Sequence, residues 1–336
     1  MSPQEGNLGR WPVLDHARLG ATVEHLRRLT QVGGKYTLTE LFEPGWGNIV
    51  FDVTPRGLRT PTLHQHGRTF EVHFRLLDGD VAIESDTGTR TLKLREGSVA
   101  GFYHEFLDAA HKLGLPPPGS AAACEIPGET RLDLDVQMRP WDNDAAFSIW
   151  SALSTASEAL TRWQAPFRGH RPRVGVMWGA FDLSSTRYRG QYADAPADRP
   201  AFLQHGMTEE YVSVGFAFGT DDAPNAGMYA YVAPQPDGFD IWSDWGGVEG
   251  TSWDEASGLA LLPWRELAGA ADPVAAIISF GDAIYRSAVE LAHWPSELVM
   301  ARFDGWHASS TPPDSSHRLP AHGQPATTDA AGRGQA

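Results

Sequence analysis

Residues 178–187, WGAFDLSSTR, place an acid, hydroxyl groups and a guanidinium among apolar side chains. On a strand, Trp178 and Asp182 would share one face, because successive side chains point to opposite sides of a sheet. A carboxylate that is buried alone is costly, so Asp182 either pairs with Arg187 or Arg56 or is held for chemistry. The first reading is a structural pair at a strand end. The second predicts that Asp182 and Arg187 line a site with Trp178 as a stacking wall.

A second set of polar residues alternates with apolar ones over residues 68–77. One face of this strand would be core, and the polar face would be exposed to solvent or would line a cleft. In a cleft, Glu71 and His73 would point the same way and form an acid and base couple, with the pKa of Glu71 raised by partial desolvation. Arg56, just past a strand end, would bind a substrate carboxylate through two hydrogen bonds.

Other residues suggest ligand or metal contacts. Tyr211 and Tyr229 fall on expected strands of the second half and would stack on a flat ligand. His64 and His66 have a spacing that puts both rings on one side of a strand, which suits zinc or iron. Because the chain has 13 histidines, such a pair arises readily by chance. We therefore expect no metal and no cofactor.

The composition excludes several classes of function. With 27 basic and 42 acidic residues, the net charge of −15 repels nucleic acid and anionic membranes. No apolar run reaches the roughly 18 residues of a membrane span, and the nucleotide-binding, zinc-protease and serine-hydrolase motifs are missing. The single cysteine, Cys124, excludes an internal disulfide and has no basic neighbour in the sequence that would activate it. We expect a cytoplasmic protein with a small-molecule substrate, and whether it forms a homodimer stays open.

The hydrophobic periodicity predicts an α+β fold. Helices are expected at residues 15–30, 98–113, 144–163 and 273–293. Strands are expected at residues 36–42, 48–54, 68–77, 81–85, 90–94, 173–188, 210–219, 228–233 and 259–262. Gly33 and Gly34 are expected to end the first helix. The repeated order of helix, antiparallel strands and helix predicts two similar, pseudo-duplicated halves whose sheets face each other across a cleft.

The domain boundaries follow from changes in composition. An N-terminal α+β half is expected at residues 11–115, a Pro-rich and irregular linker at 116–140, and a C-terminal α+β half at 141–306. Residues 307–336 are rich in Ser, Thr, Pro, Ala and Gly and have almost no large apolar residue. They are therefore expected to be a disordered tail.

Six segments in the same order resemble a bacterial family catalogued as domain of unknown function 5996. They are WPVL at residues 11–14, LTQVGGK at 29–35, VTPRGL at 53–58, GRTFEV at 67–72, SVAGFY at 98–103 and WGAFDL at 178–183. The resemblance runs from Trp11 to Trp294 and implies no established activity. The residues of its pattern that this chain keeps, and that the resemblance implies line the site, are Arg56, Glu71, Trp178, Asp182 and Arg187.

The chain departs from the family pattern at two places. Where the pattern has two tryptophans flanked by histidines, this chain has WGNIV at residues 46–50, and where it has Ser-His-Glu, this chain has Thr208, Glu209 and Glu210. Two polar anchors of the site are thus missing. A diverged copy with a long disordered tail and a composition rich in Ala, Gly and Arg suggests a specialised member of the family, with natural-product biosynthesis as one setting.

Three functions fit these residues. The first is a cofactor-independent enzyme that moves protons on an aromatic or carboxylated metabolite, with Glu71, His73 and Asp182 as catalytic groups. Cyclisation, isomerisation or a condensation of the Pictet-Spengler type would suit such a site. The second is a non-catalytic small-molecule binding protein, which the missing anchors favour. The third is a metalloenzyme with histidine ligands.

Overall fold

The computed structural model describes residues 11–126, 128, 130–195, 201–245 and 247–300. The chain divides into one unit at Met1–Met300 and another at Ala301–Ala336. The predicted tail at residues 307–336 lies outside the described residues. Within the first unit, two antiparallel six-stranded sheets and their helices form an α+β fold, which confirms the predicted class.

The first sheet is built from the N-terminal part of the chain. Its strands are β1 (Asp52–Thr54), β2 (Gly57–Arg59), β3 (Leu63–Gln65), β4 (Arg68–Arg75), β5 (Asp80–Ser85) and β6 (Gly88–Lys93). They run in the order β1-β2-β4-β5-β6, and β3 also pairs with β4. Phe70, Val72 and Phe74 of β4 are buried, and helices α1 (His16–Gly34) and α2 (Val99–His111) lie over this sheet. The clean alternation of β4 thus gives the sheet one core face and one polar face.

The second sheet is built from the C-terminal part. Its strands are β7 (Gly175–Met177), β8 (Asp182–Tyr192), β9 (Glu209–Ala217), β10 (Gly227–Ala233), β11 (Ser252–Asp254) and β12 (Leu259–Pro263). They run in the order β11-β12-β10-β9-β8-β7. Helices α3 (Asn143–Gln164) and α6 (Pro273–Leu291) pack against one face. We call the opposite face, which bears Asp182, Ser184, Gly215, Tyr229 and Tyr231, the front face.

Shorter helices complete the described part of the chain. They are α4 (Ala201–Gly206), α5 (Trp264–Gly269) and the 3-10 helices η1 (Lys35–Thr39), η2 (Pro44–Ile49) and η3 (Ser296–Leu298). Of all the helices described, none has the length and apolar character needed to cross a lipid bilayer.

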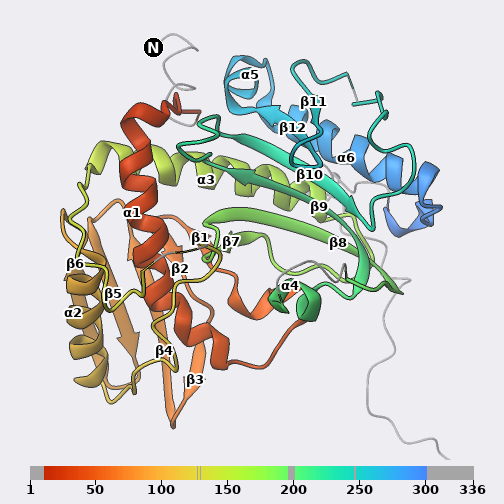
Figure 1. Ribbon diagram of the computed structural model, residues 1–336. Helices are drawn as coiled ribbons and strands as arrows, with labels where there is room; N and C mark the ends of the chain where they lie inside the picture. Colours follow the sequence, from red (N-terminus) through yellow and green to blue (C-terminus); the bar gives the residue numbers. More distant parts are fainter. Residues whose placement is uncertain (1–10, 127, 129, 196–200, 246, 301–336) are drawn as a thin grey trace, which may run out of the picture. The chain divides into compact units, whose positions relative to one another are not determined.

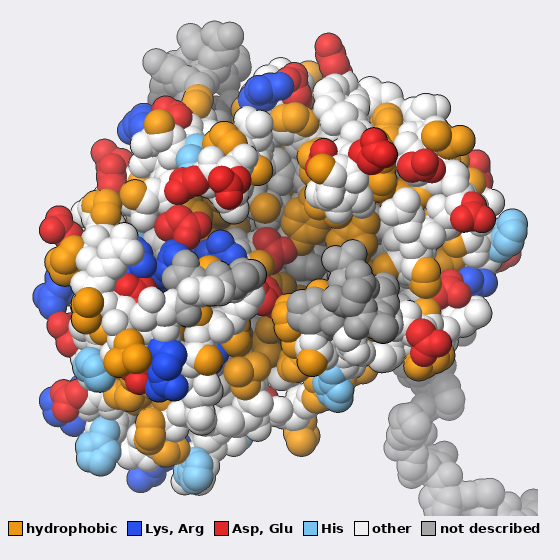
Figure 2. Space-filling model, in the orientation of Figure 1, with side chains coloured by type: hydrophobic (Ala, Val, Ile, Leu, Met, Phe, Trp, Pro, Cys, Tyr) orange, Lys and Arg blue, Asp and Glu red, His pale blue; other side chains and the backbone are white. Residues whose placement is uncertain are grey.

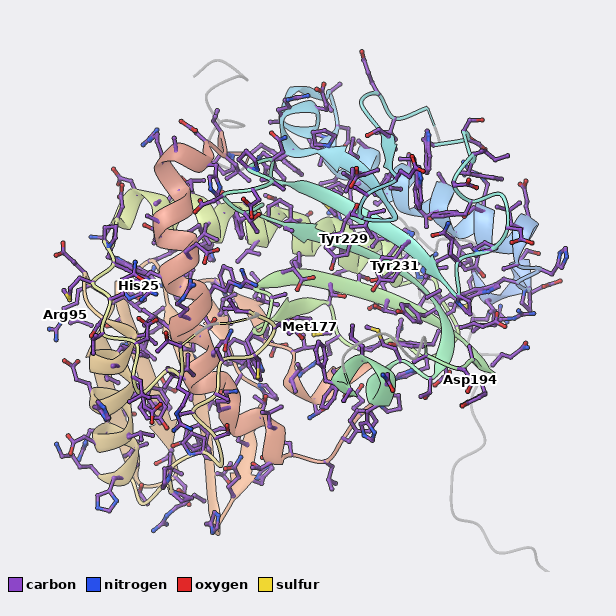
Figure 3. All side chains as sticks on the ribbon, viewed as in Figure 1. His25, Arg95, Met177, Asp194, Tyr229 and Tyr231 are labelled. Carbon is purple, nitrogen blue, oxygen red and sulfur yellow. The ribbon has the colours of Figure 1, made fainter. Side chains whose placement is uncertain are left out.

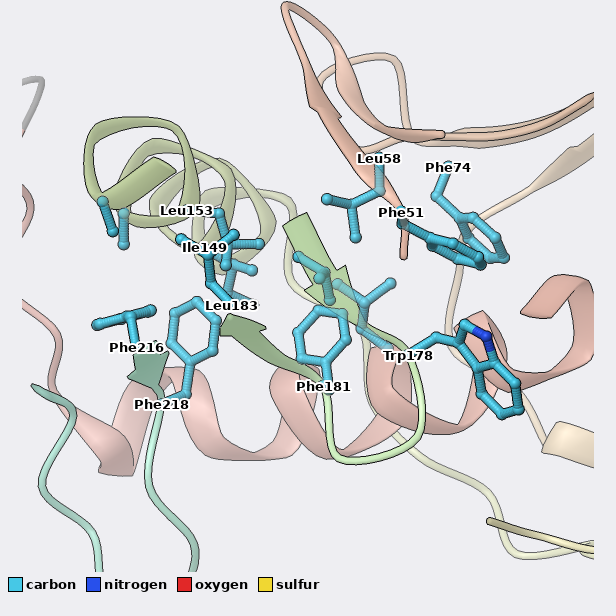
Figure 4. Close-up of a cluster of buried hydrophobic side chains, with 14 of the residues drawn as sticks. Phe51, Leu58, Phe74, Ile149, Leu153, Trp178, Phe181, Leu183, Phe216 and Phe218 are labelled. Carbon is cyan, nitrogen blue, oxygen red and sulfur yellow. The ribbon is translucent and has the colours of Figure 1, made fainter. Parts of the chain in front are cut away.

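The two sheets meet at their edges. Phe51, directly before β1, and Val176 of β7 exchange two backbone hydrogen bonds of 2.9 Å. Buried side chains from both sheets pack together near this contact, among them Phe74, Trp178 and Leu183 (Figure 4). One hydrophobic core is therefore shared by the two sheets. The internal duplication, the cleft between facing sheets and the division into two halves stay predictions.

The first helix is longer than predicted. Gly33 and Gly34 do not end α1, which runs through both of them. A Cβ on Gly33 would lie 3.1 Å from side-chain atoms of Val72 and Phe74, and a Cβ on Gly34 would overlap the ring of Trp178. The two glycines serve close packing and not termination. The strand expected at residues 36–42 is also wrong, because the 3-10 helix η1 occupies its start.

The strand expected at residues 173–188 is two strands. A turn at residues 178–181 separates β7 from β8, and Phe181 in this turn has a φ of 61°. Asp182 therefore begins β8 and does not end an apolar stripe that includes Trp178. The hydrophobic alternation of the sequence continued through the turn, so periodicity alone did not reveal it.

Candidate functional site

Three polar side chains follow one face of α1 and its C-terminal end. Arg27, Gln31 and Lys35 are four residues apart, which places them one above another. Gln31 donates from Nε2 to the carbonyl oxygen of Cys124 at 3.0 Å and accepts at Oε1 from the Cys124 N–H at 2.8 Å. Arg27 donates to the carbonyl oxygen of Glu125 at 3.3 Å. Helix α1 thereby fixes the position of Cys124 and Glu125, which lie in an irregular segment.

The carboxyl group of Glu125 lies against the turn between β7 and β8. Gln31 ties this turn to α1 through a 3.1 Å hydrogen bond from its Nε2 to the carbonyl oxygen of Gly179. A Cβ on Gly179 would lie only 2.8 Å from Cδ and Oε2 of Glu125, so glycine makes room for the carboxyl group. The backbone of Ala180, in the same turn, favours the ionised form of this carboxyl group and so lowers its pKa. The turn between β7 and β8 thus packs directly against the carboxyl group of Glu125.

The environment of Glu125 brings its pKa into the physiological range. The pKa of this carboxyl group is raised from 4.5 to about 7, because burial and, to a lesser extent, the charge of Asp182 raise it by more than Arg27 and the backbone of Ala180 lower it. The residue as a whole keeps an exposed surface, but its carboxyl end, which titrates, lies against Gly179. Near neutral pH both protonation states are therefore populated, as a group that both accepts and donates protons requires.

A second carboxyl group, that of Asp182 at the start of β8, lies on the front face. The hydroxyl of Tyr229 on β10 donates a hydrogen bond to its Oδ2. Tyr229 reaches across β9 at Gly215, where a Cβ would overlap its ring. Desolvation raises the pKa of Asp182, while the Tyr229 hydrogen bond and Arg27 lower it. Desolvation and the neighbouring Asp182 raise the pKa of Tyr229 well above its usual value, so its hydroxyl stays a donor.

A row of tyrosines leads away from Asp182 along the front face. The ring of Tyr229 stacks on that of Tyr231 with centroids 6.4 Å apart, and Tyr231 meets Tyr211 edge-on at 5.7 Å. Tyr229 and Tyr231 lie next to each other in Figure 3. Tyr211 and Tyr231 line a cavity of about 490 Å³ together with apolar Leu203 and Met207 and with acidic residues.

The surface is hollowed where these elements meet. Figure 2 shows acidic side chains in a central depression, with Lys and Arg side chains on one side of it and hydrophobic or tyrosine side chains on the other. The arrangement can hold a small molecule between charged groups and aromatic rings.

Two residues expected at the site are buried in the core. Trp178 is 1% exposed and donates from Nε1 to the hydroxyl of Thr37 at 3.1 Å. Arg187 is fully buried and lies over the ring of Trp163 at 3.8 Å. Trp178 and Arg187, which were expected to line a site with Asp182, are therefore core residues of the described structure. Asp182 and Arg187 are an odd number of positions apart on β8, so they point to opposite faces, and the partner of Asp182 is Tyr229.

Glu71 and His73 lie together on the polar face of the first sheet. Nε2 of His73 is 3.1 Å from Oε2 of Glu71, Thr62 donates to Oε1 at 2.5 Å, and a guanidinium nitrogen of Arg59 lies 3.6 Å from Oε2. Desolvation raises the pKa of Glu71, but Thr62, Arg59 and His73 together lower it below its usual value. The expected rise of this pKa toward neutrality is wrong, because the neighbouring donors and charges outweigh partial burial.

Arg56 also belongs to the first sheet. It forms an ion pair with Asp78, with a 3.0 Å hydrogen bond from Nε to Oδ2. Arg56 and His73 line one groove of about 640 Å³ with Arg59 and Arg75. The described contacts thus join Arg56 and His73 in one group, whereas Asp182, Tyr229 and Tyr211 belong to another group on the front face of the second sheet.

The two histidines considered as metal ligands lie on or next to β3. Nδ1 of His64 is 3.2 Å from the hydroxyl of Thr69, and His66 follows in the turn before β4 with a φ of 50°. Over the described residues, no three His, Cys, Asp or Glu side chains gather closely enough to hold a metal ion.

Glu125 and the polar stripe of α1 were not among the site residues expected from the sequence. The stripe had only a partial signal: Arg27, Gln31 and Lys35 repeat every four residues, but the first helix was predicted to end at residue 30, before Gln31 and Lys35. Glu125 had none, because it lies in an irregular segment whose position depends on contacts with Gln31 and Arg27, nearly a hundred residues earlier in the chain.

The structure defines an α+β protein with two antiparallel sheets. One of these sheets carries the polar candidate site on its front face. The family model described as "Family of unknown function (DUF5996)" matches residues 11–301, and the chain belongs to this family. None of the curated proteins and none of the solved structures compared with the chain matches it. Any assignment of activity therefore depends on the geometry of the site.

Proposed function

We propose that the protein is a cofactor-independent enzyme that moves protons on a small molecule bound at the front face of the second sheet. The observation that supports this most directly is the meeting of two carboxyl groups, Glu125 and Asp182, in one partly desolvated site. One has a pKa of about 7, and the other is held by the hydroxyl of Tyr229. Two carboxyl groups in different environments are a common arrangement for acid and base catalysis.

Each group has a distinct role in this proposal. Glu125 as carboxylate takes a proton from a carbon or nitrogen atom of the substrate and, once protonated, returns it at another position. Asp182, kept in place by Tyr229, stabilises positive charge that develops on the substrate. Arg27 lies close enough to lower the pKa of both carboxyl groups and would attract a substrate carboxylate.

The tyrosine row and its cavity would accept the apolar part of the substrate. A cavity of about 490 Å³ is in the size range of small-molecule sites, and Tyr211 and Tyr231 offer ring faces to an aromatic group. We therefore propose an aromatic substrate with an amine or carboxyl group. The reaction would be an isomerisation, a cyclisation or a condensation of the Pictet-Spengler type, as found in natural-product biosynthesis.

The proposal also covers the partners of the protein and its compartment in the cell. A net charge of −15 disfavours nucleic acid as a partner. A single cysteine fits a reducing compartment such as the cytoplasm. Glu71 and His73 remain an alternative acid and base pair, but the lowered pKa of Glu71 makes it a weaker base at neutral pH than Glu125.

The test is to incubate the purified protein with a panel of aromatic amines and amino acids combined with aldehydes or α-keto acids, with and without EDTA. New masses are followed by mass spectrometry. We expect a product that forms in the presence of EDTA and is lost in the variant Glu125→Gln. A product that EDTA abolishes would support the metalloenzyme alternative.

A non-catalytic binding protein is the second candidate, favoured by the cavity beside Tyr211 and Tyr231, which would hold a ligand without any chemistry. It predicts a compound that raises the melting temperature and is recovered unchanged after long incubation. Recovery of every bound compound unchanged would contradict the proposed enzyme.

A further inference from the structure

Lys35 and Cys124 form a close contact beside the site. Nζ of Lys35 lies 2.9 Å from Sγ of Cys124, although the two residues are 89 positions apart in the sequence. Lys35 is 3% exposed, so more than nine-tenths of it is buried, whereas Cys124 is partly exposed. The buried amine of Lys35 thus contacts the sulfur of a residue that keeps part of its surface exposed.

The surroundings of Lys35 are unusual for a lysine of this chain. The sequence has three lysines. Lys93 and Lys112 have carboxylate partners, at 3.8 Å from Asp80 and 2.5 Å from Asp108. Lys35 forms no ion pair with any residue that the structure describes, and its ammonium group lies over the ring of Trp178, 5.5 Å from the centroid. Its side chain is directed at the Cys124 sulfur.

The contact is held from both sides. Gln31 fixes the backbone of Cys124 with one hydrogen bond to its carbonyl oxygen and one from its N–H. Lys35 follows Gln31 by one helical turn and begins η1 at the end of α1. The hydrogen bonds of Gln31 to the Cys124 backbone and the position of Lys35 one turn later therefore keep the sulfur and the nitrogen close together. Neither bond involves these two atoms.

We propose that Cys124 and Lys35 form an oxidative modification site, at which a peroxide links the sulfur and the amine by a covalent S–N bond. In the first step the sulfur attacks the peroxide: an S–O bond forms, the O–O bond breaks, water leaves and Cys124 becomes a sulfenic acid. In the second step the Lys35 amine attacks this sulfur: the S–N bond forms, the S–O bond breaks and a second water leaves. Cys124 loses two electrons, the peroxide gains them, and the ammonium proton passes to solvent.

The chemistry follows from known reactions of sulfenic acids. A cysteine sulfenic acid condenses with a nearby thiol or nitrogen. The chain has no second cysteine, so within the chain a nitrogen is the available partner. The Lys35 amine is already in contact with the sulfur. The link would tie α1 to the segment that carries Glu125, and it does not depend on the proposed catalytic function.

The test uses the full chain treated with a small excess of hydrogen peroxide, digested with a protease that cuts between residues 35 and 124, and mapped by mass spectrometry. We expect one cross-linked pair of peptides whose mass is the sum of the two, less two hydrogen atoms. Dithiothreitol should restore both peptides. This mapping needs no variant, so a folding defect cannot obscure the result.

Two lysine variants control the assignment. Lys35→Met should abolish the cross-linked pair and divert Cys124 to higher oxidation states, whereas Lys112→Met, which removes an exposed lysine, should leave the pair unchanged. Melting curves before oxidation establish that both variants fold. The proposal is overturned if wild-type Cys124 is oxidised only to sulfinic or sulfonic acid, or if the loss of two hydrogen atoms persists at Cys124 in Lys35→Met. The latter would assign the bond to a backbone nitrogen.

Discussion

The two sheets each carry carboxylates on a polar face, but the surroundings of these carboxylates differ. On the first sheet, Glu71 accepts a hydrogen bond from Thr62 and lies near Arg59 and His73, and its pKa is lowered. Beside the second sheet, Glu125 of the irregular segment and Asp182 of β8 are both desolvated, with Arg27 as the nearby cation, and the pKa values of both are raised.

The comparison shows that an acid residue on a sheet face does not by itself define a catalytic group. The balance between desolvation and neighbouring donors or charges decides the sign of the pKa shift. On the first sheet this balance favours a stable carboxylate, and on the second it favours a group that exchanges protons near neutral pH. The four predictions below would confirm or reverse this assignment.

The largest expected effect is on turnover. Glu125→Gln should reduce the rate by about 10²–10⁴-fold, the usual contribution of a general acid or base, while Glu71→Gln should retain most of the activity. The measurement is product formation by mass spectrometry with the substrate found in the panel. A rate lost in Glu71→Gln and kept in Glu125→Gln would reverse the comparison and restore Glu71 as the catalytic acid or base.

The next effect concerns two arginines that were both expected to bind substrate. Arg187→Met should lower the free energy of unfolding by about 2–4 kcal/mol, because it removes a buried hydrogen bond to the carbonyl oxygen of Trp163 and a cation–π contact. Arg56→Met removes an exposed ion pair with Asp78 and should leave the free energy of unfolding nearly unchanged. Urea unfolding of both variants measures the difference. Equal losses would show that Arg187 is not a structural residue.

A smaller effect is expected from the glycine under Tyr229. Gly215→Ala should cost about 1–3 kcal/mol, because the added methyl group overlaps the Tyr229 ring and must displace it from Asp182. Gly97→Ala is the matched control, since its Cβ would meet nothing closer than a backbone oxygen at 3.9 Å. Melting temperatures of the two variants provide the comparison. A variant Gly215→Ala as stable as wild type would mean that Tyr229 does not lie across β9.

The smallest effect is the pH dependence of stability. The pKa of Glu125 is about 7 in the folded chain against 4.5 ordinarily, so the folded state binds more protons between these values and the stability contribution of Glu125 falls as pH rises through them. The pKa of Glu71 is lowered, so its contribution is present above the ordinary pKa and is lost on acidification.

The two glutamines should therefore shift stability in opposite directions. Relative to wild type, Glu125→Gln should gain stability as pH rises from about 4.5 to 7, whereas Glu71→Gln should be less stable at neutral pH and approach wild type in acid. Solvent screens the charge of Glu71 more than that of Glu125, whose carboxyl end is desolvated, so the shift should be the smaller one for Glu71→Gln. Melting curves at several pH values would measure it. Shifts of the same sign would contradict the comparison.

Much of the fold could be predicted from the sequence where local periodicity was long. Helices α2, α3 and α6 and strands β4 and β5 lie close to the predicted ranges, since each has an apolar stripe with the period of its own element. The errors occurred where packing overrides local preference. Gly33 and Gly34 lie inside α1 because Val72, Phe74 and Trp178 occupy the space of their side chains.

For the candidate site, the sequence by itself determined which chemical groups were available. It supplied Asp182 and Tyr229 as polar residues on strands, and it supplied Arg27, Gln31 and Lys35 at a spacing of four residues. Local alternation and helical spacing were sufficient for this, because they depend on neighbours within a few residues.

Only the tertiary structure decided which of these groups meet and in which protonation state. Arg187 lies on the helix-covered face of the second sheet, whereas Asp182 lies on its front face. The carboxyl group of Glu125, which was not predicted, packs against Gly179 in the turn between β7 and β8. The Lys35 amine contacts the Cys124 sulfur. The physical reason is that desolvation and charge act through space over a few ångströms, whereas the residues that supply them are about a hundred positions apart in the chain.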